Sequence, residues 1–172
     1  LESQEPVKEF DFLGITLGYE MCYTNVLQIL DLSHISLLAK DRKEDDPIVI
    51  GGGACAYNPE PIAEFFDMFY IGEGETVYDA LFDVYKATKA AGGSRKDFLF
   101  AASKIPGIYV PSLYNVSYKE DGTIASFTPV KEGIPEKVCK QLITDITKDY
   151  RAIKAPVVPF IKATQDRVTL EI

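Results

Sequence analysis

Two glycine-rich stretches of the sequence could expose backbone N–H groups to a ligand. Each follows a short apolar run, at 48–50 and at 68–71. Because glycine carries no side chain, such loops can bind a phosphate or a nucleotide through backbone amides. The same glycines could instead form tight turns after buried strands, and both interpretations stay open. The candidate ligand-binding residues are Gly51, Gly52, Gly53, Ala54, Gly72, Glu73 and Gly74.

Acidic and aromatic residues lie beside these loops. Glu73 and Glu75 flank Gly74 and could accept hydrogen bonds from a ligand, or stabilise the start of the next helix through its dipole. Tyr19 and Glu20 follow an earlier predicted strand, so they are further cofactor-binding candidates at the same sheet edge. Asp67 precedes an apolar run and is interpreted as a solvated residue rather than a catalytic base.

Metal-ligating and nucleophilic residues are sparse. The chain has one histidine, His34, and three distant cysteines, Cys22, Cys55 and Cys139, none spaced as in a zinc or iron–sulfur site. No cation near Cys55 in sequence would activate its thiol, so it is interpreted as inert. We therefore expect no catalytic residue and no metal site in this chain.

The glycine stretches are connected by a predicted βαβ unit. A buried parallel strand is predicted at 48–50, and a second at 68–71. Between them, Asn58-Pro59-Glu60-Pro61 is typical of a helix start. Parallel strands with right-handed crossovers end at one sheet edge, where open α/β sheets bind ligands.

The flanking sequence predicts further α/β elements. A strand is predicted at 10–17 and a short one at 35–38. We expect Thr24 to cap one helix, Thr76 to cap a second that Gly92-Gly93 ends, and Ser94 to cap a third over 95–103. A β-hairpin is predicted from 107–118 and 124–130, which flank the turn signal 120–122. Residues 131–159 are expected to form an extended linker with at most a weak helix near 138–150, and 167–172 a final strand.

Composition excludes several function classes. The chain has 172 residues and a net charge of −8, which disfavours a nucleic-acid partner. No apolar run approaches the roughly 20 residues that span a membrane. The polar start does not have the pattern of a signal peptide. The three distant cysteines are typical of reduced thiols, so a cytoplasmic location is expected.

The longest motifs carry a family resemblance. The glycine loop followed by Pro59-Glu60, and Gly72-Glu73-Gly74-Glu75-Thr76 after the next strand, resemble the cobalamin-binding-type domain that precedes the barrel in many radical S-adenosylmethionine (SAM) enzymes. A closer resemblance, to a subgroup of uncharacterised radical SAM proteins, extends over nearly the whole chain and includes Asn58-Pro59-Glu60-Pro61 and the run Tyr23 to Leu27.

The resemblance implies an architecture. It implies a flavodoxin-like α/β domain over 1–105, with a mainly parallel sheet and helices on both faces. A hairpin at 106–130 and a linker with a first strand at 131–172 would then lead to a radical SAM barrel. That barrel would hold a 4Fe–4S cluster and SAM, and it is the expected partner. Earlier sequence in relatives would supply further strands, so an unpaired sheet edge of this chain could favour self-association.

The resemblance also implies a function. The domain would position a cobalamin-like or nucleotide cofactor, or a substrate, at the carboxyl edge of the sheet. The chain lacks the Asp-x-His-x-x-Gly cobalamin signature, so cobalamin would be held without a protein histidine on cobalt. The alternatives are a degenerate domain that docks a substrate or protein, and a stand-alone nucleotide- or flavin-binding protein.

Overall fold

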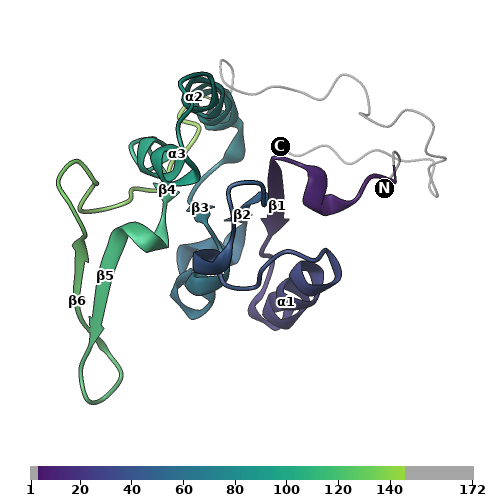
Figure 1. Ribbon diagram of the computed structural model, residues 1–172. Coiled ribbons are helices and arrows are strands. Elements are labelled where there is room, and N and C mark those ends of the chain that lie inside the picture. Colours follow the sequence, from purple (N-terminus) through teal and green to yellow (C-terminus); the bar gives the residue numbers. More distant parts are fainter. Residues whose placement is uncertain (1–3, 146–172) are drawn as a thin grey trace.

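The computed structural model describes residues 4–145 and contains a four-stranded sheet (Figure 1). Strands β1 (Phe12–Thr16), β2 (Ile48–Gly52) and β3 (Met68–Tyr70) are parallel, and β4 (Ile108–Tyr109) pairs antiparallel with β3. The order is β1-β2-β3-β4. The prediction of an α/β fold with a mainly parallel sheet is confirmed.

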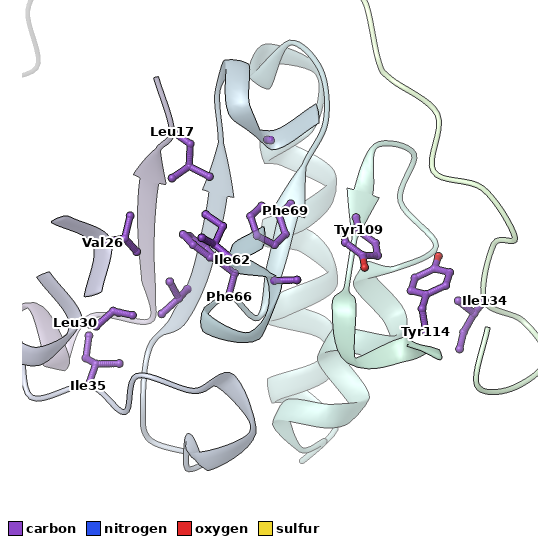
Figure 2. Packing of buried hydrophobic residues seen from close by; sticks show 13 residues of the cluster. Leu17, Val26, Leu30, Ile35, Ile62, Phe66, Phe69, Tyr109, Tyr114 and Ile134 are labelled. Atoms are coloured by element: carbon purple, nitrogen blue, oxygen red, sulfur yellow. The ribbon is translucent and has the colours of Figure 1, made fainter. Parts of the chain in front are cut away.

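Successive residues of the strands pack into two different clusters. Val49 and Phe69 lie in a core with α1 (Tyr23–Leu32) and the 3₁₀ helix η5 (Glu60–Phe65), as Figure 2 shows in part. The alternate residues of these strands pack against α2 (Tyr78–Ala90) and α3 (Arg95–Ala102). Helices therefore cover both faces, which is why the strands are apolar at consecutive positions.

Strand order decides where a crevice can form. In the described sheet, β1, β2 and β3 are neighbours in both sequence and space, so the order does not reverse among residues 4–145. Doubly wound folds such as flavodoxin bind ligands where strand order reverses. The flavodoxin-like type stays a prediction for this reason.

Two predicted helix caps are wrong. The N-cap of α1 is Cys22, without a side-chain cap, because a 3₁₀ turn over Glu20–Cys22 leads directly into the helix at Tyr23. Helix α2 begins after Val77, and the hydroxyl of Thr76 donates instead to the carbonyl of Glu73 at 3.0 Å. In both places a preceding 3₁₀ turn replaces the side-chain cap.

Other helix boundaries match the prediction. Ser94 caps α3 reciprocally with Asp97: its hydroxyl oxygen accepts from the Asp97 amide, and the Asp97 carboxylate accepts from the Ser94 amide at 2.8 Å. Gly92 follows α2 with φ of +69°, which favours glycine and ends the helix.

Two predicted elements differ in the structure. Residues 35–38 form no strand, and the segment is irregular before a 3₁₀ turn over Ala39–Asp41. The helix expected from Asn58 onward is the six-residue 3₁₀ helix η5, with a kink at Ile62 where φ is −130°. Because the backbone of Ile62 leaves the helical region, the turns on either side of it do not join into the α-helix that the sequence predicted.

The predicted hairpin is confirmed with changed bounds. Strands β5 (Tyr114–Tyr118) and β6 (Ile124–Pro129) form a separate antiparallel sheet. A 3₁₀ turn over Pro111–Leu113 divides the predicted strand 107–118 into β4 and β5. The hairpin projects beside the main sheet in Figure 1.

The segment after the hairpin packs against the domain. Ile134 is buried in the core with α1, and the hydroxyl of Tyr114 donates to the carbonyl of Pro135 at 2.8 Å. Gln141 forms an isolated parallel bridge with Gly72. Residues 138–145 contain no helix, and the rest of the predicted linker and the strand 167–172 lie outside the described residues. The division into three domains stays a prediction.

Candidate functional site

The three parallel strands bring the predicted ligand residues to one edge of the sheet. Tyr19 and Glu20 follow β1, the first glycine stretch ends β2, and the second follows β3. This carboxyl edge is where open parallel sheets bind ligands. The contacts of the glycines decide how much of it is accessible.

Two of the three glycines at the end of β2 are closely packed against other parts of the domain. A Cβ on Gly51 would come within 2.7 Å of the Phe69 ring. Gly53 has φ of +90°, and a Cβ there would lie 2.9 Å from the carbonyl oxygen of Leu17. Gly52 differs, since a Cβ there would have no neighbour within 4 Å. The glycines on either side of Gly52 are therefore required by packing, while Gly52 lies open.

The β3 glycine loop is covered by a distant part of the chain. The amide of Gln141 donates to the carbonyl of Ile71, and its carbonyl accepts from the amide of Glu73, both at 3.1 Å. The Glu73 carboxylate also accepts from the amide of Ile143. We call residues 139–143 the strap. It occupies the space above Gly72, so the backbone there is not available to a ligand in this conformation.

Glu73 and its neighbours form an internal hydrogen-bond network. The carbonyl of Glu73 accepts from the Tyr70 hydroxyl at 2.8 Å, and the Tyr70 hydroxyl also contacts the hydroxyl of Thr76 at 2.8 Å. Burial is the main cause that raises the pKa of Tyr70. A Cβ on Gly74 would meet the hydroxyl oxygen of Tyr78 at 3.2 Å. This loop starts α2 and anchors the strap.

The β1–β2 half of the edge carries exposed apolar side chains. Tyr19 is 58% exposed, Met21 77% and Tyr57 53%. The amino group of Lys140, in the strap, lies 5.0 Å from the centre of the Tyr57 ring. A hydrogen bond with Tyr57 raises the pKa of Lys140. Of the predicted site residues, Glu20 and Ala54 are also exposed on this half. We call Tyr19, Met21, Gly52 and Tyr57 the edge surface; Tyr19 and Gly52 are predicted site residues, while Met21 and Tyr57 were not predicted.

The cysteines lie in segments of this edge but do not form a metal site. Cys22 follows β1, Cys55 lies in the β2 loop and Cys139 is in the strap. Within residues 4–145, no three His, Cys, Asp or Glu side chains gather as metal ligands. The Tyr23 hydroxyl contacts the Cys55 thiol, and the pKa of Tyr23 is raised first by burial and then by that thiol. His34 follows the end of α1, at the opposite edge.

Asp67 is not the solvated residue that the sequence suggested. It is 3% exposed, and its carboxylate accepts from Arg42 and Arg95 at 2.7 Å each and from the amide of Val49 at 2.8 Å. Arg42 donates further to the carbonyls of Ser36, Leu37 and Phe65. Desolvation is the main cause that lowers the pKa of Arg42.

This cluster at the amino edge is structural. Asp67 binds Arg42 from the loop before β2 and Arg95 from the start of α3. Arg95 also donates to the carbonyls of Asp46 and Pro47, so the cluster holds that loop against α3. The partners are 25 and 28 residues from Asp67 in the sequence. Sequence patterns give no signal for such a distant ion pair.

Sequence reasoning also missed a groove between η5 and β5. It has a volume of about 480 Å³ and is lined mainly by η5 and by the even-numbered residues of β5. The hydroxyl of Tyr109 donates to the Glu60 carboxylate at 2.5 Å. Burial, and then Glu60, raise the pKa of Tyr109. The tyrosines of residues 107–118 were the one sequence feature that could have indicated this groove, but we interpreted them only as typical of a strand.

The comparisons with known proteins identify the family of this chain. The model of a family described as radical SAM proteins, N-terminal, matches residues 1–111, and the chain belongs to this family. It is 41% identical over 78 residues to an uncharacterized protein of Methanocaldococcus jannaschii. That match covers 44% of this chain and 16% of the relative, so this chain spans only a small part of the relative's length. No solved structure matches the chain.

Among residues 4–145, no helix combines the length and the apolar character needed to cross a bilayer.

Proposed function

We propose that this chain is an accessory domain of a radical SAM protein, and that its edge surface docks against the remainder of that protein. The observation that carries the proposal is the division of the carboxyl edge. The strap covers the β3 half, while the β1–β2 half presents Tyr19, Met21 and Tyr57 to solvent. Large exposed apolar side chains along one edge of a domain favour a protein–protein contact there.

The family membership supports this choice of partner. The matched family is defined as the N-terminal part of radical SAM proteins, and the relative is much longer than the match. A catalytic part elsewhere in such a protein is the partner that the domain would meet at the highest effective concentration. Under this proposal the 4Fe–4S cluster and SAM belong to that part.

A second candidate function is cofactor binding over Gly52. The open space above Gly52 and the exposed rings of Tyr19 and Tyr57 favour a flat or phosphorylated molecule on the β1–β2 half. The tight packing at Gly51, Gly53 and Gly72 leaves less bare backbone than the sequence suggested.

The residues present do not fit a cobalamin ligated by histidine. The chain has one histidine, and His34 follows α1 at the opposite edge of the sheet from Gly52. A nucleotide, or cobalamin without a protein ligand on cobalt, is therefore the chemistry that this candidate function requires.

Hydrogen exchange of the full-length protein tests the docking proposal. We expect the amides of residues 19–22 and 54–57 to exchange more slowly in the full-length protein than in this chain alone. The substitution Met21→Asp should abolish that difference. Leu32→Asp is the matched control, since Leu32 is 71% exposed and ends α1 at the opposite edge. Equal exchange in both proteins would refute docking at this surface.

Titration with hydroxocobalamin, and separately with ATP, tests the second function. If docking is the function, neither titrant binds: the visible spectrum of cobalamin stays unchanged, and both elute apart from the protein on a size column. Binding that Gly52→Leu abolishes would instead support the cofactor site. Gly18→Leu is the control, because a Cβ at Gly18 also meets no atom within 4 Å.

A further inference from the structure

Strand β1 has an outer edge that no described residue pairs with. The carbonyl of Asp11 accepts from Ile48 at 2.9 Å, and the amide of Leu17 donates to Gly52 at 2.7 Å, so the odd-numbered residues bond to β2. Since parallel strands alternate, the amides and carbonyls of Phe12, Gly14 and Thr16 point away from β2. Gly14 and Thr16 are exposed. Among residues 4–145, β1 is therefore an open edge strand.

Within residues 4–145, β1 carries none of three common devices against strand addition. These devices are a lysine, a proline and a β-bulge on the edge strand. β1 reads Phe-Leu-Gly-Ile-Thr, and its pairing with β2 is regular over all five residues. Phe12, Leu13 and Ile15 pack into the two cores. This composition is typical of an internal strand, so the edge is suited to accept another strand.

We infer that the β1 edges of two copies of this chain pair antiparallel about a two-fold axis at Gly14. The outward residues are symmetric about Gly14, because Phe12 would lie opposite Thr16 of the second copy and Gly14 opposite its own equivalent. These three positions would exchange six backbone hydrogen bonds, about two for each hydrogen-bonded antiparallel pair. The edge is thus complementary to itself, as an isologous interface requires.

Neighbouring side chains support the same surface. Phe82 of α2 packs edge-on against Phe12 with 5.5 Å between ring centres, and Tyr78 stacks on Phe82 at 6.1 Å. Both remain exposed, Phe82 by 40% and Tyr78 by 54%. A two-fold axis perpendicular to the sheet would leave the α2 face of both copies on the same side. The rings of Tyr78 and Phe82 from each copy would therefore lie on either side of the paired β1 strands. The apolar contact adds to the backbone bonds. This inference is independent of the docking proposal, which concerns the carboxyl edge.

The association state of the 172-residue chain tests the inference. Light scattering after size exclusion should show a monomer–dimer equilibrium that shifts toward dimer as concentration rises. Gly14→Glu should weaken the dimer about fivefold, because like charges would face each other across the axis. The monomer tolerates this change, since a Cβ at Gly14 meets only Ile50, at 3.9 Å. Gly52→Glu is the matched control: it adds the same charge at an open position on β2.

A second variant removes outward donors without touching the β1–β2 ladder. Thr16→Pro deletes an amide that points away from β2, and prolines are tolerated at such positions of edge strands. Two hydrogen bonds are lost per dimer, so the dissociation constant should rise about thirtyfold. Circular dichroism verifies that each variant is folded. A chain that stays monomeric at millimolar concentration, or a dimer that neither edge variant weakens, would overturn the inference.

Discussion

The backbone of Gln141 occupies the position that a side chain on Gly72 would need. A Cβ on Gly72 would approach the amide nitrogen of Gln141 to 2.7 Å, and Gly72 has φ of +139°. The two residues are joined by backbone bonds on either side, from Gln141 to Ile71 and from Glu73 to Gln141. Gly72 is therefore the residue on which closure of the strap depends.

The substitution Gly72→Ala should release the strap. The Cβ collides with backbone atoms, which cannot rotate away as a flexible side chain would, and the left-handed φ adds strain of about 1–3 kcal/mol. We expect the amides of Glu73 and Gln141 to exchange faster with solvent, as measured by hydrogen exchange with mass spectrometry.

Gly92→Ala is the control for backbone strain alone. Gly92 also has a positive φ, of +69°, but a Cβ there meets no atom within 4 Å. It should lower stability without exposing the amides of residues 139–143. Equal exchange at the strap in both variants would contradict the role assigned to Gly72.

Removal of the Asp67 charge should destabilise the whole domain. Asp67→Asn leaves Arg42 and Arg95 buried without their counter-charge, and breaking a buried pair in this way typically costs about 3–5 kcal/mol. Urea unfolding at neutral pH measures the loss. Asp83→Asn, on the exposed face of α2, removes the same charge and should change the free energy of unfolding by less than about 0.5 kcal/mol. A similar small effect for both variants would show that the cluster contributes little.

The contact of Asp11 with Lys89 should make stability depend on pH at the extremes. The Lys89 amino group and the Tyr85 hydroxyl both donate to the Asp11 carboxylate at 2.6 Å. These hydrogen bonds lower the pKa of Asp11 below 3.8, with the larger contribution from Lys89. Asp11 and Tyr85 raise the pKa of Lys89 from 10.5 to about 12. Both side chains are 60% exposed, so the contribution is small, roughly 0.2–1 kcal/mol.

The direction of each pKa shift defines the pH range in which the pair of Asp11 and Lys89 stabilises the fold. A lowered carboxylate pKa stabilises the fold above about pH 4, and this contribution is lost as the pH falls through the folded-state pKa. A raised lysine pKa stabilises below about pH 10, and this is lost as the pH rises toward 12. The destabilisation by Asp11→Asn should therefore be constant from about pH 5 to 9 and shrink outside that range. Unfolding midpoints across pH measure it, and a difference that persists at about pH 2 would exclude this pair as the cause.

Local patterns predicted the elements whose cause is local. Residues 48–50 form a buried strand because the run is apolar on both faces, and Ser94 caps α3 because Asp97 stands three residues later. The hairpin over residues 114–129 follows from two strand-like runs around a turn signal. Each of these depends on residues within one short window of the chain.

The remaining features depend on distant partners. Residues 35–38 are apolar enough for a strand, but Arg42 binds the carbonyls of Ser36 and Leu37 and holds the segment irregular. The bare glycines of the candidate site were recognised, but their coverage by Phe69, Leu17 and Gln141 was not, because none of these is a sequence neighbour. The exposure of Tyr19 and Tyr57 likewise follows from the packing of whole elements.

The ion cluster around Asp67 also constrains how the domain can open. Arg42 lies in the loop before β2, Arg95 in α3 and Asp67 directly before β3, so three separate segments must assemble before the cluster is complete. Detaching one segment leaves a charged side chain buried without its counter-charge, where water cannot solvate it, and this costs free energy. Partly opened forms are therefore penalised at every step, and the domain should melt in a single cooperative transition rather than unravel from one end.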